Sequence, residues 1–345
     1  MAAGPALLVE ASSGKVLYAE EIDRRWHPAS LTKIMTAYLT FEALKSGKLS
    51  LDSKISCSWL AHQEQPSKIG LPIGAKISVR LALDALIVKS ANDVAIMLAE
   101  AIGGTHDAFV ARMNATARRL GMTRTHYDNP NGLPSPGQIT TARDLAKLSR
   151  AILRDFPEYA YLWKKRSFRI GRRRIGGHNG LLTTFKGADG LKTGFICDSG
   201  YNVVASATRD GRKLLAVVLG ATSGHNRSIR ATSLLEHGFR IYGWKQFFNT
   251  DNIDNLPMAR LAGKVASIRK QVHSRACGYY RPRHRRRHRR KARRVARKKV
   301  THSRKKVAHS RAKAVRKRRA KYARTKRKSR KRPNRRVAAK ISTKN

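Results

Sequence analysis

The sequence predicts an α/β protein with an antiparallel sheet flanked by helices, an all-helical lobe and a disordered basic C-terminal tail. Three observations lead to this fold class. Short strand-like runs lie near both ends of residues 1–250, the segment between them has helical periodicity, and no acidic residue follows Asp254. Strands at the two ends of a body can pair in one antiparallel sheet, which leaves the helical middle as a separate lobe.

The first predicted element is a β-hairpin. Two short apolar runs, residues 6–10 and 15–19, are joined by a turn that contains Gly14, and this arrangement favours a hairpin. After Pro28 the apolar side chains recur at helical spacing, and Gly47 is a suitable end for that helix.

The middle of the chain has the periodicity of helices. Residues 81–102 form a long apolar stretch that ends at two glycines, and residues 106–120 repeat the pattern. Residues 129–137 are rich in Asn, Pro and Gly, which is typical of turns and loops. Thr141, with an acidic residue three positions on, predicts a capped helix that runs toward Leu153.

The last part of the body returns to strands. Residues 190–196, 201–208 and 213–219 are short strand-like runs. An Asp-Gly pair between the last two is a strong signal for a two-residue hairpin turn. A helix over residues 228–242 closes the body.

Charge separates this body from a tail. Of the 74 Lys and Arg residues, 34 lie in residues 281–345 and five in residues 255–280; the remaining 35 lie in residues 1–254 together with all 21 acidic residues. A block of like charge repels itself and cannot bury a core, so we expect disorder there. The tail would also bind anionic surfaces in a salt-dependent way.

The predicted domain organisation follows from these patterns. A single domain covers residues 1–250, with its helical lobe at about residues 45–155. Residues 251–280 form a linker, and residues 281–345 form the disordered polybasic tail. No apolar run in the sequence has the length needed to span a membrane.

Residues 30–33 read Ser-Leu-Thr-Lys, an S-x-x-K motif at a predicted helix start. Side chains three residues apart share one face of a helix, so the Lys33 amine can reach the Ser30 hydroxyl. The Ser30 N–H lies at the positive end of the helix dipole, where it can stabilise an oxyanion. The motif alone is also compatible with an ordinary helix start.

Two further triplets follow at intervals of about 60 and 100 residues. Residues 90–92 read Ser-Ala-Asn, a polar interruption of an otherwise apolar segment, and residues 192–194 read Lys-Thr-Gly at the start of a strand. Gly194 would let a ligand backbone approach that strand closely. The order S-x-x-K, S-x-N, K-T-G, with each motif on a suitable element, is far more specific than any one of them.

With these motifs the chain resembles the serine D-Ala-D-Ala carboxypeptidases, the low-molecular-mass penicillin-binding proteins. Residues 27–36, 129–133, 140–146 and 200–207 also look like that family, and the resemblance covers roughly residues 5–245. It implies a penicillin-sensitive enzyme that removes the terminal D-Ala from peptidoglycan stem pentapeptides and needs neither metal nor cofactor.

The resemblance also implies roles for individual residues. Ser30 would be the nucleophile that forms the acyl-enzyme, Lys33 its general base, and Ser90 a proton relay to the leaving amine. The Ser30 and Phe195 N–H groups would form the oxyanion hole. The substrate-binding residues would be Asn92, Lys192, Thr193, Gly194, Phe195 and Arg227.

Other functions share the same features. A D,D-endopeptidase performs the same chemistry, and a serine β-lactamase has the same motifs. Class A β-lactamases add a loop glutamate; between Ser90 and Lys192 only Glu158 is a glutamate in a loop-like context, and it lacks the expected neighbours, so we favour the peptidase. The polybasic tail alone would suit a nucleic-acid- or polyanion-binding protein.

The resemblance implies a location in the periplasm or cell envelope, where the tail would meet anionic polymers or lipids rather than nucleic acid. Because Met1 leads straight into a strand-like segment, we expect the true start codon, with its export signal, to lie upstream. In an oxidising compartment Cys197 could pair with Cys277, or both could stay free with Cys57; the sequence leaves both possibilities open.

We expect the tail to control where the protein binds and to contribute nothing to its chemistry. Truncation after Tyr280 should change turnover of a soluble D-Ala-D-Ala peptide by no more than about twofold, because every motif lies in the body. Retention on anionic vesicles or wall material should fall sharply, and a salt titration of the full chain is the control. Loss of soluble-substrate turnover in the truncated chain would contradict this prediction.

Overall fold

The computed structural model describes residues 4–248, 251–259, 265–272, Cys277, Lys313 and 316–321 of the chain. Residues 1–279 belong to one compact unit and residues 280–345 to a second. Of the predicted tail, only Lys313 and residues 316–321 are described, and these are helical and exposed. Helix there was not expected, and the high helix propensity of Arg, Lys and Ala accounts for it.

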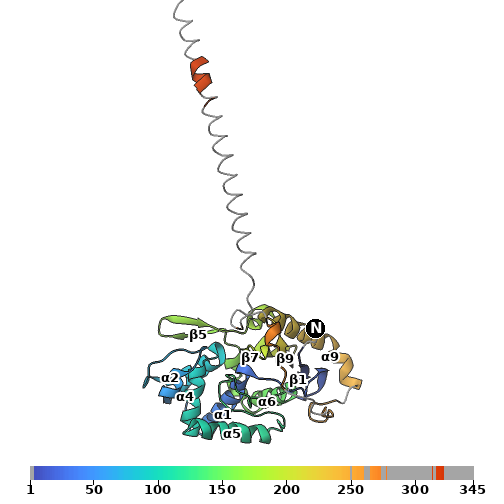
Figure 1. Ribbon diagram of the computed structural model, residues 1–345. Coiled ribbons are helices and arrows are strands. Elements are labelled where there is room, and N and C mark those ends of the chain that lie inside the picture. Colours follow the sequence, from blue (N-terminus) through green and yellow to red (C-terminus); the bar gives the residue numbers. More distant parts are fainter. Residues whose placement is uncertain are drawn as a thin grey trace, which may run out of the picture. The chain divides into compact units, whose positions relative to one another are not determined.

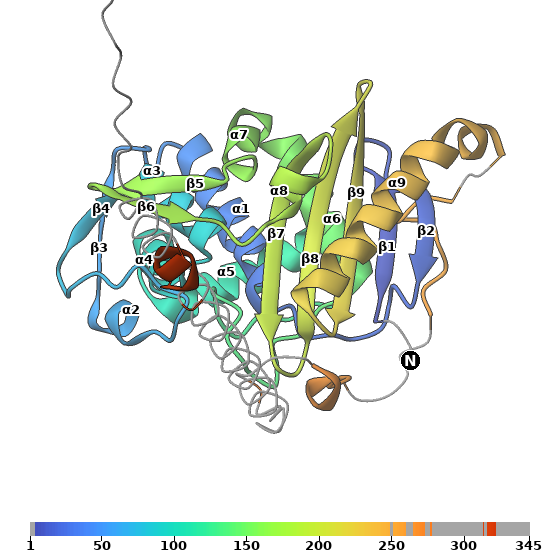
Figure 2. The same ribbon diagram turned by 90° about the horizontal axis from the view of Figure 1, so that it is seen from above.

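The body is built on one five-stranded antiparallel sheet with the order β2-β1-β9-β8-β7 (Figure 2). The strands are β1 (Ala6–Glu10), β2 (Val16–Glu20), β7 (Ala188–Ile196), β8 (Gly200–Arg209) and β9 (Arg212–Ala221). Strand β1 pairs with β9, so the two ends of the body meet in one sheet. The predicted fold class is confirmed.

Helices cover both faces of this sheet. Alternation along β1 sends Leu7 and Val9 to one core and Ala6 and Leu8 to the other. The first core contains side chains of α1 (Lys33–Lys45) and α6 (Ala142–Asp155); the second contains side chains of α8 (Leu181–Thr184) and α9 (Gly224–Phe248). Although we placed residues up to about 155 in the helical lobe, α6 packs against the sheet because its apolar stripe faces that core.

The lobe beside the sheet is mainly helical (Figure 1). Its elements are α2 (Trp59–Gln63), α3 (Val79–Asp84), the π-helix η2 (Ala85–Lys89), α4 (Asn92–Gly103), α5 (His106–Arg119) and the two-stranded sheet of β3 (Lys54–Ser56) and β4 (Lys76–Ser78). Among the described residues no single helix has the length and apolar composition to span a membrane. Helices α4 and α5 meet these two criteria only when they are taken together, and they are bent by 85° relative to each other.

The predicted continuous helix over residues 81–102 is wrong. The chain leaves the π-helix η2 at Ser90, which has the left-handed conformation (φ 63°, ψ 38°), and passes through an extended Ala91 before α4 begins at Asn92. A left-handed conformation is costly for a residue other than glycine, and such strain is often found at functional sites. The break coincides with the polar interruption of the apolar segment.

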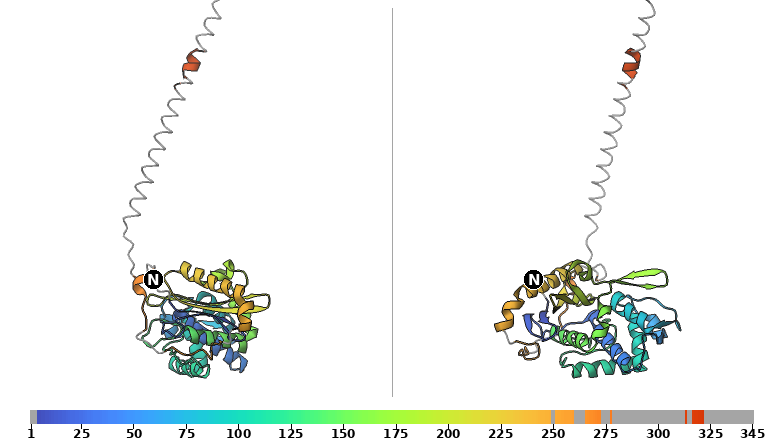
Figure 3. Two further views of the ribbon diagram at one scale, coloured as in Figure 1. Left: turned by 90° about the vertical axis from the view of Figure 1, so that its right-hand side faces the viewer. Right: turned by 180° about the vertical axis from the view of Figure 1, so that it is seen from behind.

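The remaining elements lie between α6 and β7 and before α1. They are the 3-10 helices η1 (Ala29–Thr32) and η3 (Pro157–Tyr159), the short helix α7 (Ala160–Trp163), and the hairpin of β5 (Ser167–Ile170) and β6 (Arg173–Gly176). In Figures 1 and 3 this hairpin extends away from the five-stranded sheet on the side where the helical lobe lies. The sequence patterns did not predict it.

Much of the expected linker lies against the body. Arg143 and Asp23 form a buried ion pair, and the Arg143 guanidinium also donates to the carbonyl oxygens of Ile253 (2.7 Å) and Leu256 (3.1 Å). Ile253 is fully buried. A buried guanidinium needs several acceptors, and the carbonyl oxygens of this segment supply them.

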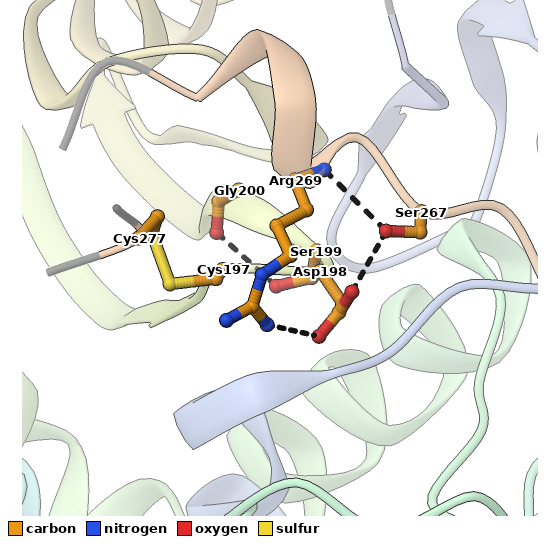
Figure 4. The surroundings of a disulfide bond; sticks show 7 residues. All are labelled: Cys197, Asp198, Ser199, Gly200, Ser267, Arg269 and Cys277. Atoms are coloured by element: carbon orange, nitrogen blue, oxygen red, sulfur yellow. Dashed lines mark hydrogen bonds and ion pairs between the residues drawn. A yellow bond between two sulfur atoms is a disulfide. The ribbon is translucent and has the colours of Figure 1, made fainter. Parts of the chain in front are cut away.

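A disulfide joins the turn after β7 to the segment that leaves the body (Figure 4). Cys197 pairs with Cys277, and next to them Asp198 accepts hydrogen bonds from the Ser267 hydroxyl at 2.7 Å and from Arg269 at 3.3 Å. Cys57 is free and buried. Of the two possibilities that the sequence left open, the structure contains the disulfide, a bond that suits an oxidising compartment.

Candidate active site

The three sequence motifs come together between the sheet and the helical lobe. Ser30 lies in η1, and Lys33 begins α1 directly after it. The Lys33 amine donates to the Ser30 hydroxyl at 3.2 Å and to the Asn92 side-chain oxygen at 2.7 Å. In a 3-10 helix residues three apart are eclipsed, which places the amine beside the hydroxyl.

The sheet holds the segment that carries Ser30. A Cβ atom on Gly194 of β7 would lie only 3.0 Å from the Ser30 nitrogen, so glycine allows the strand and this segment to approach. The Asn202 amide on β8 donates to the His27 carbonyl at 3.1 Å. We expected Gly194 to make room for a ligand; in the structure its immediate neighbour is the backbone at Ser30.

A second glycine supports the same segment from the lobe side. Gly132 has a φ of 81°, and a Cβ atom there would lie 1.9 Å from the Ala29 carbonyl oxygen. A non-glycine residue would therefore be both strained and in collision. Neighbouring Asn131 accepts a short hydrogen bond at its carbonyl from the Lys33 amine, so the loop over residues 129–133 completes the surroundings of that amine.

Lys33 is buried among neutral acceptors. Its side chain is 1% exposed, and its hydrogen-bond partners are Ser30, Asn92 and the Asn131 carbonyl. Burial, and then the positive charge of Lys192, hold the pKa of the Lys33 amine well below its usual range, against weaker opposing effects of two carboxylates. The neutral amine is therefore favoured, and it can accept a proton from the Ser30 hydroxyl.

Lys192 and Arg227 form a cationic end of the site. Lys192 is 2% exposed and donates to the Thr193 carbonyl at 3.0 Å. Burial, and secondarily the charge of Arg227, lower the pKa of Lys192 to about 7. The Arg227 Nε atom is buried without a hydrogen-bond partner among the described residues. Unpaired buried cations are costly, so this end fits a ligand carboxylate.

The break between η2 and α4 contributes two polar side chains. The Ser90 hydroxyl is buried and has no hydrogen-bond partner in the part of the chain that the structure describes. The Asn92 oxygen accepts from Lys33, and its amide nitrogen donates to the Gln65 carbonyl at 2.8 Å, which leaves one amide proton free. Ser90 therefore has an unused hydroxyl beside the site, whereas Asn92 mainly positions Lys33.

Phe195 and Thr193 continue the site along β7. Thr193 is buried, and the Phe195 ring packs on Tyr201 of β8 with ring centroids 4.3 Å apart. Because Gly194 lies against the Ser30 nitrogen, the Phe195 N–H follows directly after the closest point between strand and nucleophile segment. The Lys33 amine contacts Ser30 and Asn92 directly and is affected by the charge of Lys192, whereas Arg227 lies in α9 and acts through its charge on Lys192.

Sequence reasoning missed Glu64, which follows α2. Burial raises the pKa of its carboxyl, while the Asn131 amide and the Lys33 charge act in the opposite direction. The Asn131 nitrogen has no hydrogen-bond partner in the described part of the chain. Glu64 precedes Ser90 in the sequence, outside the interval between Ser90 and Lys192 that contains Glu158, and Glu158 is exposed in η3.

Comparison with solved structures identifies the class. The crystal structure of the D-alanyl-D-alanine carboxypeptidase DacD from Francisella tularensis is 34% identical, with a TM-score of 0.67 over 69% of this chain and 70% of that chain. Penicillin-binding protein D2 from Listeria monocytogenes, in its cefotaxime-bound form, is 31% identical. Its TM-score is 0.63, and the match covers 69% of this chain and 97% of that chain. The fold is that of the penicillin-binding D,D-peptidases.

The family follows from the sequence comparisons. The profile of the D-alanyl-D-alanine carboxypeptidase family matches residues 1–223, and the chain belongs to this family. DacC of Escherichia coli is 37% identical over 243 residues, or 68% of this chain and 61% of that protein. DacA of Haemophilus influenzae is 35% identical over 238 residues, with the same coverage. The chain thus spans about three fifths of the length of these relatives.

We expect two charge changes to shift the titration of Lys33 in opposite directions. Glu64→Gln removes a negative charge that favours the protonated amine, so the acidic limb of Ser30 acylation should move to lower pH. Lys192→Gln removes a positive charge that disfavours it, so the limb should move to higher pH. The measurement is the rate of labelling by a fluorescent penicillin against pH.

The control for this pH profile is Glu158→Gln, which removes an exposed carboxylate in η3 and should leave the limb in place. Shifts of the Glu64 and Lys192 variants in the same direction would contradict the account of Lys33.

Proposed function

We propose that this protein is a penicillin-sensitive serine D-Ala-D-Ala carboxypeptidase that removes the terminal D-Ala from peptidoglycan stem pentapeptides. One observation carries the proposal: the buried Lys33 amine lies 3.2 Å from the Ser30 hydroxyl, and among the described residues it has no carboxylate within hydrogen-bond distance. The names of the family and of the relatives support the same substrate.

In the proposed mechanism, the neutral Lys33 amine takes the Ser30 proton as the hydroxyl oxygen attacks the carbonyl between the two D-Ala residues. The Ser30 and Phe195 N–H groups stabilise the oxyanion. As the C–N bond breaks, Ser90 relays the proton held by Lys33 to the leaving amine, which returns Lys33 to its neutral form, and free D-Ala departs. Water then attacks the acyl-enzyme ester and releases the shortened peptide and Ser30.

In the proposed complex, residues of β7 and Arg227 of α9 bind different parts of the substrate. Lys192, Thr193 and Arg227 bind the terminal carboxylate, a role that the buried Lys192 and the shielded, unpartnered Nε atom of Arg227 support. Gly194 keeps the strand close to Ser30, and the free amide proton of Asn92 is available to the substrate backbone. Because these protein groups need a carboxylate as partner, the site selects peptides with a free C-terminus.

A serine β-lactamase is the second candidate, because Glu64 places a carboxylate near Lys33 and Asn131. Such a carboxylate could activate the water that releases a penicilloyl group. The lifetime of the penicillin acyl-enzyme separates the two functions. A peptidase keeps the penicillin label for a long time, whereas a β-lactamase hydrolyses it quickly. If the protein is a β-lactamase that uses Glu64, the Glu64→Gln variant should keep the label. A D,D-endopeptidase would instead cut the cross-links between stem peptides, and this is measured as the conversion of dimeric to monomeric muropeptides.

The proposed location is the cell envelope, with peptidoglycan peptides and β-lactams as partners. The Cys197–Cys277 disulfide supports an oxidising compartment. The polybasic tail, nearly all of which lies outside the described residues, is proposed to bind anionic envelope polymers or lipids; nucleic acid is the alternative partner. Retention on envelope rather than nucleoid fractions separates these.

We expect Ser30→Ala to abolish both covalent labelling by a fluorescent penicillin and release of D-Ala from a pentapeptide, because the substitution removes the hydroxyl oxygen that forms the acyl-enzyme ester. Ser12→Ala and Ser13→Ala, in the turn between β1 and β2, are matched controls and should retain both activities. Gel fluorescence and enzymatic detection of D-Ala are the measurements. Residual labelling of the Ser30 variant would refute the assignment.

A further inference from the structure

The β5–β6 hairpin carries a dense block of positive charge within the body. Residues 164–174 contain seven Lys and Arg residues, and no acidic residue lies between Glu158 and Asp189. Among the described residues only Lys165 of this block forms an ion pair, with Asp84 at 2.6 Å. The hairpin projects from the body in two opposite views (Figures 1 and 3), and the other six cations of the block are exposed.

The two faces of the hairpin differ. Phe168 and Ile175 are directly opposite each other and pack against the main core. Arg169 and Arg174 are also directly opposite each other and are both exposed. Like charges at facing positions of an antiparallel pair destabilise it. No carboxylate among the described residues compensates them, although Arg174 donates to the Ser167 hydroxyl at 2.9 Å.

The base of this hairpin lies at the candidate active site. The Gly177 nitrogen donates to the Arg166 carbonyl at 2.9 Å and closes the hairpin, and a Cβ atom on Gly177 would lie 3.2 Å from Val88, two residues before Ser90. Lys165 and Arg166 line a pocket together with Thr193 of the K-T-G strand. The cationic surface is therefore continuous with the cleft.

We propose that the β5–β6 hairpin is a docking arm for the anionic peptide chains of the cell wall. Its arginine face binds free carboxylates of a stem peptide, or of a neighbouring one on the same glycan, while a D-Ala-D-Ala end occupies the cleft. Two facing guanidinium groups suit carboxylates because each can donate two parallel hydrogen bonds. This inference rests on the proposed function and adds a binding surface outside the reacting residues.

A peptide ligand fits this position better than an anionic lipid surface. Lys165 and Arg166, at the base of the hairpin, line a pocket with Thr193 of the proposed substrate strand, rather than lying on a side remote from the cleft. The hairpin can therefore bind the same molecule that reacts. A lipid contact would use the arginines without changing how peptides bind.

The test uses the full chain with Arg169→Gln and Arg174→Gln combined. The matched control is Arg118→Gln with Arg240→Gln, which removes two exposed charges from α5 and α9 that have no ion pair among the described residues. The substrates are a stem pentapeptide with free side carboxylates, the same peptide with those groups amidated, and a short N-acylated peptide whose only carboxylate is the terminal one.

We expect the hairpin variant to lose about fivefold to tenfold in kcat/KM for the acidic pentapeptide, through KM with kcat unchanged, because a ground-state contact is removed. The amidated and short peptides should react equally with variant, control and unaltered chain, and penicillin labelling should stay the same. Normal labelling shows that the variant is folded.

Equal kinetics of the hairpin variant and the control on the acidic pentapeptide would overturn the docking arm while leaving the carboxypeptidase function intact. If the kinetics are equal but the hairpin variant is retained less on phosphatidylglycerol vesicles, the hairpin binds lipid. That outcome would also overturn the docking arm. An unaltered chain that releases D-Ala from none of the three peptides would overturn the proposed function, and the docking arm with it.

Discussion

The architecture of the site depends on the burial of one amine. Lys33 is almost fully buried, and its hydrogen-bond acceptors are a hydroxyl, an amide oxygen and a backbone carbonyl. A buried ammonium ion without a carboxylate partner is costly, so burial favours the neutral form. Lys192 adds a second cation that acts in the same direction. A carboxylate in direct contact would stabilise the charged amine and remove its capacity to accept a proton.

The surroundings that keep this amine neutral come from three parts of the chain. The sheet holds the nucleophile segment through Gly194 and Asn202, the loop at Gly132 supports it from the other side, and the left-handed Ser90 ends η2 so that Asn92 reaches Lys33. Two of these contacts are approaches that a Cβ atom would prevent. At these points the backbone of the nucleophile segment is in direct contact with β7 and with the loop at Gly132. A small displacement of either element would therefore move Ser30 and Lys33.

Positive charge is organised at two scales in this protein. Inside the cleft, Lys192 is buried, and Arg227 is half-buried with its Nε atom shielded from solvent; together they define the end that suits a carboxylate. Outside it, the β5–β6 hairpin carries exposed cations, and Lys165 and Arg166 at its base line a pocket with Thr193, the residue after Lys192. Buried charges discriminate between ligands because they are costly when unpaired, whereas exposed charges mainly raise the local concentration of anions. The two surfaces therefore suit the end and the body of one acidic chain.

The five strands of the main sheet, the helices after Pro28 and Thr141, and the three motifs could be predicted from the sequence, because they depend on local periodicity, turn residues and fixed spacing. The break at Ser90, the packing of residues 251–272 and the Cys197–Cys277 pair were decided by the tertiary structure. Glu64 and the hairpin arginines were also invisible in the sequence as parts of a site. Their significance lies in which distant groups they face, and that is set only when the chain packs.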